Sequence, residues 1–111
     1  MKNLIKLLIL LFVVMGETSS FPVQISSFVG SFITEHSVKI EWATVSEVNN
    51  YGFNLQRYNS STGSYETIGF IAGKGTTLEP QSYSFVDENV SLSEAQYRLE
   101  QIDNDGLKNY F

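Results

Sequence analysis

The sequence contains no cysteine and only one histidine among its 111 residues. The absence of cysteine excludes disulfides, so stability must come from apolar burial and strand pairing, which suits a β-sandwich better than a small disulfide-linked fold. It also excludes a lipid-anchored lipoprotein, because no cysteine follows the apolar stretch near the start of the chain. The lack of a second histidine and of a convergent acidic cluster argues against a small enzyme.

Positive charge is also scarce. Seven lysine and arginine residues stand against twelve acidic ones, for a formal charge of -5. Two of the cations, Lys2 and Lys6, lie at the very start of the chain, so a chain without its first residues would be more acidic still. Nucleic-acid binding depends on cations that neutralise phosphates, so nucleic acid is excluded as a partner.

Residues 1–20 have the layout of a secretory signal peptide. Lys2 and Lys6 precede an apolar run from Leu7 to Val14, and cleavage is expected after Gly16 or Ser20. A membrane-spanning helix is the competing interpretation, but the run is shorter than the roughly 20 residues that a bilayer core requires. We therefore expect one domain over residues 21–111, secreted or at the cell surface, with membrane contact only during export.

The stretch from residue 38 to residue 58 organises the expected fold. Val38, Ile40 and Trp42 alternate with polar or small residues, and Phe53 and Leu55 do the same further on. Each alternation is typical of a strand with one buried face. Between them, residues 44–52 are rich in residues that leave regular structure easily, which predicts a polar loop at a wide corner between two sheets.

The remainder of the chain predicts further short strands. Pro22 suits a first, edge strand, and a bulge within residues 65–72 is expected to place Tyr65, Ile68 and Phe70 on one side, with Tyr65 in the core. Residues 59–64 and 103–106 read as hairpin turns, and residues 73–80 as a long flexible connection between sheets. The coarse prediction is an all-β antiparallel sandwich of about seven strands, the last of them short. Its expected core residues are Trp42, Phe53, Leu55, Tyr83, Phe85, Tyr97 and Leu99.

Five blocks in order resemble a known family: FPVQISSF, WATVSEVNNYGFNLQR, YETIGFIAGKGTT, YSFVD and YRLEQIDNDG. They resemble the fibronectin type III-like module that precedes the C-terminal sorting domain in bacterial proteins of the type IX secretion system. The resemblance implies an immunoglobulin-like sandwich of a three-stranded and a four-stranded sheet, with Trp42 as the core pin of the second strand and Tyr97 in the sixth. It also implies a spacer or adhesive unit without catalytic residues. Because no sorting domain follows residue 111, we expect a fragment of a larger secreted or surface protein.

The candidates for chemistry each have a simpler explanation. His36 lies in a predicted surface turn, and Glu41 and Glu47 are expected to be solvated surface charges rather than a catalytic pair. Residues 73–75, Gly-Lys-Gly, lack the rest of a phosphate-binding loop. Residues 103–106 fit a hairpin turn better than a calcium loop. We therefore predict no catalytic residue, no cofactor and no metal.

Tyrosines are the best candidates for a binding surface. Tyr51, Tyr58 and Tyr110 are expected to be exposed, where aromatic rings can stack on sugars or anchor a protein. The predicted function is a non-catalytic structural or interaction module whose partner is a protein or a polysaccharide. The strand at residues 107–111 offers an edge that could pair with another chain. The alternative is a carbohydrate-binding accessory domain, which would need two or more coplanar exposed aromatic rings.

Overall fold

The computed structural model describes residues 22–111, and the predicted signal peptide lies outside them. The described chain is all-β and antiparallel, as predicted, with one short 3-10 turn. Its elements are β1 (Val23–Thr34), β2 (Ser37–Asn59), β3 (Ser64–Thr77), β4 (Gln81–Asp87), η1 (Leu92–Glu94), β5 (Tyr97–Asp103) and β6 (Lys108–Tyr110).

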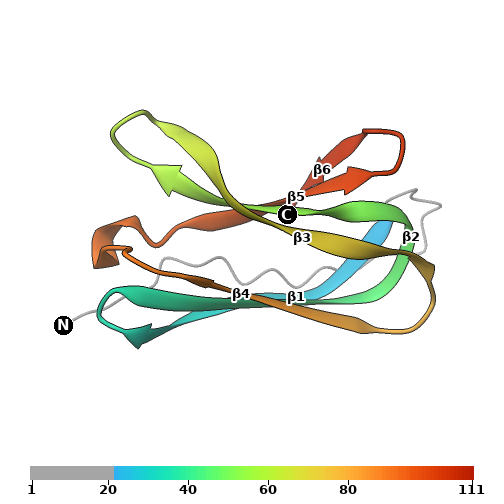
Figure 1. Cartoon of the computed structure of the whole chain (residues 1–111), viewed down its shortest axis with the longest axis horizontal. Coiled ribbons are helices and arrows are strands. Elements are labelled where there is room, and N and C mark those ends of the chain that lie inside the picture. The colour runs from blue at the N-terminus through green and yellow to red at the C-terminus, as the bar shows by residue number, and fades with distance from the viewer. Residues whose placement is uncertain (1–21) are drawn as a thin grey trace.

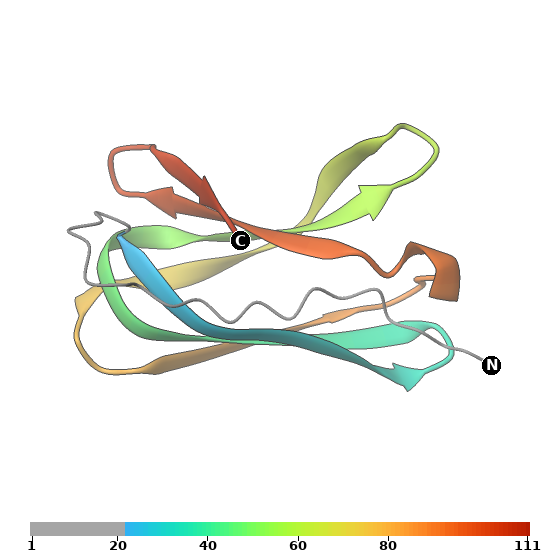
Figure 2. The same ribbon diagram turned by 180° about the vertical axis from the view of Figure 1, so that it is seen from behind.

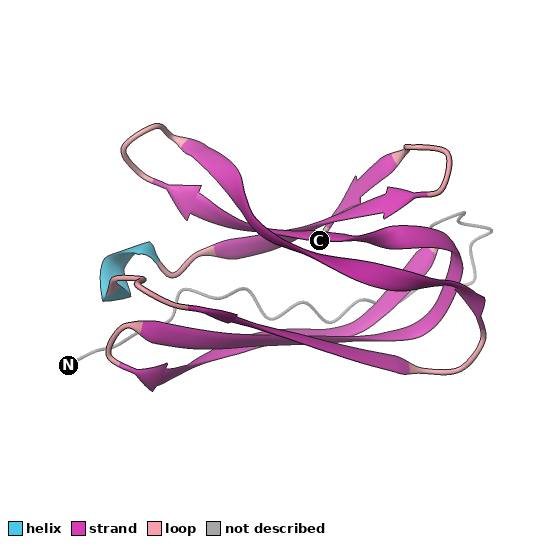
Figure 3. Ribbon diagram, viewed as in Figure 1, coloured by secondary structure: helices cyan, strands magenta, loops and turns pink. Residues whose placement is uncertain are grey.

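Strand β2 connects the whole structure. Its first half pairs with β1 and β4, and its second half pairs with β3 and β5, which in turn pairs with β6. The sheet therefore curls back on itself, and Figures 1 and 3 show the two groups of strands facing each other across the core. The same arrangement is seen from behind in Figure 2.

The prediction of a loop at residues 44–52 is wrong, because these residues belong to β2. The chain does change its strand partners there, as the predicted corner between two sheets implied. Register shifts between Glu47, Asn50 and Gly52 bend the backbone while pairing with β3 continues on both sides. Bulges of this kind insert extra residues into a strand and turn it without ending it. The two strands expected at residues 38–58 are therefore one bent strand, and the described residues form six strands rather than about seven.

The core lies between the two halves of β2. Trp42 is 1% exposed; its ring stacks on Tyr83 at a centroid distance of 5.6 Å and meets the edge of Phe53 at 5.6 Å. The indole Nε1 has no hydrogen-bond partner in the described residues, so packing alone holds the ring. Six of the seven expected core residues are buried: Trp42, Phe53, Leu55, Tyr83, Tyr97 and Leu99. The seventh, Phe85, is half-buried and packs against them.

Both predicted hairpin turns are present. Residues 59–64 connect β2 to β3, and Gly63 there has φ of +74°. At residues 103–106 the Gly106 N–H donates to the Asp103 carbonyl at 2.9 Å, and Gly106 has φ of +93°. A left-handed backbone at these two positions favours glycine, which explains why the turn residues were readable from the sequence.

Strand β3 departs from the prediction in two ways. The expected bulge exists, because Leu55 pairs with Gly69 while Gln56 pairs with Thr67. It places Ile68 against the core, however, and leaves Tyr65 half-buried outside the core beside Tyr58. The prediction that Tyr65 lies in the core is therefore wrong, and so is the prediction that Phe70 shares the side of Ile68, because Phe70 is exposed beside Tyr51. The predicted flexible connection at residues 73–80 is also shorter, because β3 continues to Thr77.

A cluster of charged and polar side chains connects the two groups of strands at one end of the structure. The Arg57 Nη1 donates to both oxygens of Asp87 at 2.7 and 2.6 Å, and the Tyr97 hydroxyl donates to Asp87 Oδ2 at 2.6 Å. Asp87 ends β4, whereas the other two residues lie on the facing strands β2 and β5. Charge-assisted hydrogen bonds of this kind are shorter and stronger than neutral ones, so this cluster ties the two sides of the core together.

We expect Trp42→Ala to lower the free energy of unfolding by about 3–5 kcal/mol, because the large ring is fully buried and its loss leaves a cavity. Denaturant unfolding followed by tyrosine fluorescence measures the change. Val45→Ala on the same strand is the matched control. Val45 is 47% exposed, so this change should cost no more than about 0.5 kcal/mol. A near-neutral result for Trp42→Ala would contradict the register of β2.

Candidate binding surface

The residues considered for chemistry are not brought together. Glu41 is exposed and lies 3.5 Å from Lys39, as expected for a surface charge. His36 is exposed in the turn between β1 and β2, with Glu35 as its nearest ionic neighbour at 3.8 Å. Within residues 22–111, no three or more His, Cys, Asp or Glu side chains are grouped so that they could hold a metal ion.

Glu47 contradicts the expectation of a solvated charge, because it is 0% exposed. Its carboxylate accepts four hydrogen bonds: from Tyr83 OH at 2.5 Å, Thr44 Oγ1 at 2.8 Å, Asn50 Nδ2 at 2.9 Å and the Lys74 backbone N–H at 2.9 Å. The bend in β2 turns this residue inward, and strict alternation along a straight strand gave no sign of it. A buried carboxylate that is saturated with donors cannot reach a substrate, so its role is structural.

The electrostatics at Glu47 follow from these contacts. Burial raises the pKa of the carboxyl, but the hydrogen bonds from Tyr83, Asn50, Lys74 and Thr44 together hold it below its usual value of 4.5. Burial and the neighbouring carboxylate raise the pKa of the Tyr83 phenol in turn. The pair is therefore a buried carboxylate and a neutral phenol that donates to it.

The hydrogen bonds continue from Glu47 across the second half of the sheet. Asn50 Oδ1 accepts from Gln101 Nε2 at 2.9 Å, and that nitrogen also donates to Asp103 Oδ1 at 3.0 Å. Asn109 Nδ2 donates to Gln101 Oε1 at 3.1 Å, which brings β6 into the network. Gly73 packs so closely on Asn50 that an added Cβ would lie 2.4 Å from its Nδ2. This close approach explains one glycine of the Gly-Lys-Gly sequence without a phosphate.

Aromatic side chains gather on the outer side of β3, β2, β5 and β6. Tyr58 lies opposite Tyr65, and their rings are 5.4 Å apart. Tyr51 and Phe70 form a second pair at 5.4 Å and are 57% and 45% exposed. We call this surface the aromatic face; it consists of Tyr51, Tyr58, Tyr65, Phe70, Arg98 and Tyr110. The three tyrosines predicted to form a binding surface belong to it, but only Tyr51 and Tyr110 are exposed; Tyr58 is half-buried because its ring packs against Tyr65.

Arg98 belongs to this face although, like Phe70, it is not among the binding residues predicted from the sequence. Its Cζ lies 4.3 Å from the centroid of the Tyr65 ring and 4.4 Å from that of Tyr110. Its Nε donates to Gln56 Oε1 at 2.7 Å. The alternation along β5 could have placed Arg98 on the outer side, but its two aromatic neighbours come from β3 and β6, whose registers were not known.

Glu100 fixes the position of Tyr110 at the edge of the face. Its carboxylate accepts from Asn54 Nδ2 and from the Tyr110 hydroxyl, both at 2.8 Å, and lies 3.7 Å from Lys108 Nζ. Burial raises the pKa of Glu100, but these two donors and the charges of Lys108 and Arg98 lower it overall. Tyr110 is therefore held in place although it is 51% exposed.

The rings of the aromatic face do not form a flat platform. The planes of Tyr51 and Phe70 meet at 37°, and those of Tyr58 and Tyr65 meet at 66°. Neither pair meets the requirement for coplanar rings that a carbohydrate-binding domain would set. The geometry fits an irregular protein surface better than the flat face of a sugar chain.

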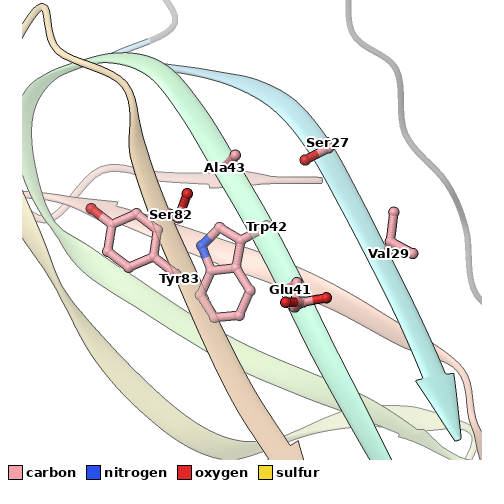
Figure 4. Close-up of a pocket in the computed structure, with 7 residues that line it drawn as sticks. All are labelled: Ser27, Val29, Glu41, Trp42, Ala43, Ser82 and Tyr83. Atoms are coloured by element: carbon pink, nitrogen blue, oxygen red, sulfur yellow. The ribbon is translucent and has the colours of Figure 1, made fainter.

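The opposite side of the molecule carries an open depression of about 350 Å³, shown in Figure 4. Ser27, Ala43 and Ser82 form one row across β1, β2 and β4, and their short side chains leave the space. It contains one charged group, Glu41, which is a solvated side chain. Small side chains alone do not make a binding site, so the aromatic face is the stronger candidate.

No protein-family model, no curated protein and no solved structure matches the chain. Within the described residues, no helix combines the length and the apolar character that crossing a bilayer requires.

We expect Glu47→Gln to lower the free energy of unfolding at pH 7 by about 1–3 kcal/mol, because an amide cannot accept all four hydrogen bonds. The matched control is Glu41→Gln, which alters an exposed ion pair and should change stability by less than about 0.5 kcal/mol. Equal effects of the two substitutions in urea unfolding at pH 7 would contradict the buried position of Glu47.

The difference between the native chain and Glu47→Gln should also depend on pH. A carboxyl whose pKa is lower in the folded state stabilises the fold above the unfolded pKa, and that contribution is lost as pH falls through the folded pKa. Because the pKa of Glu47 lies below 4.5, the difference should be constant near neutral pH and shrink below pH 4.5. Urea unfolding between pH 3 and pH 7 measures it. A difference that stays constant over this range would show that Glu47 does not ionise as described.

Proposed function

We propose that the chain is a non-catalytic, exported interaction module, either a spacer or an adhesive unit, that binds a partner through its aromatic face. The observation that carries this proposal is the aromatic face, in which Tyr65 and Tyr110 contact Arg98 and an exposed pair of rings lies on the same outer side. Tyrosine and arginine are enriched among the residues that contribute most binding energy at protein interfaces. The buried hydrogen-bond networks below the face hold these side chains on rigid strands, which reduces the entropy cost of binding.

We also propose that the fold is a fibronectin type III-like sandwich. The arrangement of the strands supports this: β1, the first half of β2 and β4 lie together, as do β3, the second half of β2, β5 and β6. If each half of β2 is counted as a strand, the groups hold three and four strands, the division that the family resemblance implies. The burial of Trp42 and Tyr97 also supports this proposal.

Strand addition at β6 is a second route to a partner. Within the described residues β6 pairs only with β5, so one side of its backbone is open to another strand. This strand has three residues, so the edge offers few backbone hydrogen bonds. The longer strand β3 also has an open side, but its register shifts interrupt that edge. We therefore assign the main contact to the aromatic face and a supporting one to β6.

A carbohydrate-binding accessory domain is the alternative function. Exposed tyrosines support it, because aromatic rings stack on sugars. The angles of 37° and 66° within the two ring pairs argue against a flat sugar-binding platform. A protein partner is therefore the better proposal.

Substitutions on the aromatic face should abolish partner capture. We expect the immobilised protein to retain a specific envelope or secreted protein of the source organism. The double variant Tyr51→Ala, Tyr110→Ala should retain at least about 90% less of that partner, because truncating two anchors costs at least about 2 kcal/mol of binding free energy. Quantitative mass spectrometry of the retained proteins measures this. The control is Val29→Ala with Val86→Ala, two exposed residues outside the aromatic face.

Three outcomes of this experiment are distinguishable. Loss with the tyrosine pair alone supports the aromatic face, provided that the variant unfolds at the same urea concentration as the native chain. Loss of partner capture with the valine pair alone would place the binding site on the opposite side of the molecule. Retention of a glycan instead of a protein, in a parallel capture on insoluble polysaccharides, would favour the carbohydrate-binding alternative.

Export makes a separate prediction. If residues 1–20 are a signal peptide, peptide mass spectrometry of medium and envelope fractions should find a product that begins near Glu17 or Phe21. A product that retains Met1 and stays inside the cell would contradict export. Peptides that extend past Phe111 would show that the module is part of a longer protein.

A further inference from the structure

The guanidinium of Arg98 is held in place by its neighbours, but not all of its hydrogen-bond donors have an acceptor in the described residues. Tyr65 from β3 and Tyr110 from β6 contact it through their rings, and Gln56 accepts from its Nε. Its two Nη groups have no hydrogen-bond or ion-pair partner within residues 22–111. The four N–H bonds of these groups therefore have no acceptor among the described residues, although the planar cation is held between two rings.

Glu100, the nearest acidic side chain on the same strand, makes no hydrogen bond or ion pair with Arg98 within residues 22–111, although the two charges attract each other. Glu100 already accepts hydrogen bonds from Asn54 and Tyr110 and lies 3.7 Å from Lys108. Its two oxygens are thus directed toward β2 and β6. The face presents one arginine whose two Nη groups bind no carboxylate of the described residues and whose cation is framed by aromatic rings.

We propose that Arg98 is the anchor for an acidic segment of a protein partner, with an aspartate or glutamate carboxylate bound to its two Nη groups. This inference rests on the proposed function and names the chemistry of the ligand. A carboxylate matches the fork of the guanidinium and forms two parallel hydrogen bonds with it. The flanking rings exclude water from the cation and keep its orientation, so little rotamer entropy is lost when the ion pair forms.

The charge of the whole chain favours a short acidic segment over a polyanionic polysaccharide. The formal charge is -5, so a long polyanion that extends past Arg98 and Lys108 would meet exposed carboxylates. A single acidic side chain is affected mainly by charges within a Debye length of about 8 Å at physiological salt. Arg98 supplies the positive charge there, because the charge of Lys108 is already offset by Glu100.

The experiment uses three small probes with ¹⁵N-labelled protein. They are a blocked pentapeptide with one glutamate, its glutamine counterpart, and galacturonate. We expect the glutamate peptide to shift the Arg98 Nε–H signal at millimolar concentration and to bind about tenfold more tightly than the glutamine peptide and galacturonate. Arg98→Lys should weaken the glutamate peptide about fivefold or more, because a lysine keeps the charge but loses the paired geometry. Lys39→Gln, which removes an exposed cation outside the aromatic face, should leave the affinity unchanged.

Each other result overturns the inference. No shift with the glutamate peptide, equal binding of the glutamine peptide, or unchanged affinity in Arg98→Lys would each show that Arg98 does not bind a carboxylate. Tighter binding of galacturonate would assign the site to an acidic sugar instead. Urea unfolding of Arg98→Lys excludes a folding defect. If the glutamate peptide does not bind but the tyrosine variant still loses partner capture, only the carboxylate ligand is rejected. If the tyrosine variant captures the partner as well as the native chain does, the proposed function itself is rejected.

Discussion

The buried carboxylate of Glu47 is the contact on which the architecture depends. It sits where β2 turns from one set of partners to the other, and it accepts hydrogen bonds from β2 itself, from β3 and from β4. The register shifts at Glu47, Asn50 and Gly52 bend this strand of 23 residues, and the contacts of Glu47 hold the bend from inside. By collecting donors from three strands, Glu47 fixes the bend that allows the two halves of β2 to enclose Trp42.

The cluster of Asp87 with Arg57 and Tyr97 ties the sheet together elsewhere, between β4 and the second half of β2. These two buried acidic clusters, in a chain without disulfides, restrict how the strands can slide. The consequence for function is a rigid outer surface. Tyr58, Tyr65 and Arg98 lie on paired strands with fixed registers, so the aromatic face is preformed, as the proposed binding of a partner would favour.

Much of the fold was readable from the sequence, because alternation and turn chemistry are local signals. The core positions of Trp42, Leu55 and Leu99 and both hairpin turns follow from them. The bend is predicted as a loop because a sequence rich in polar residues is the same whether their side chains face water or form hydrogen bonds with one another in the interior. Arg98 was missed for a related reason: its aromatic neighbours lie on strands far away in the sequence, and only the register across four strands brings them together.

The most direct test of this account is the titration of the Glu47 side-chain carboxyl by ¹³C NMR on the folded protein. The four hydrogen bonds predict that its chemical shift stays that of a carboxylate down to a midpoint below pH 4.5. A midpoint above 4.5 would mean that burial outweighs the donors, and the bend in β2 would then need another explanation.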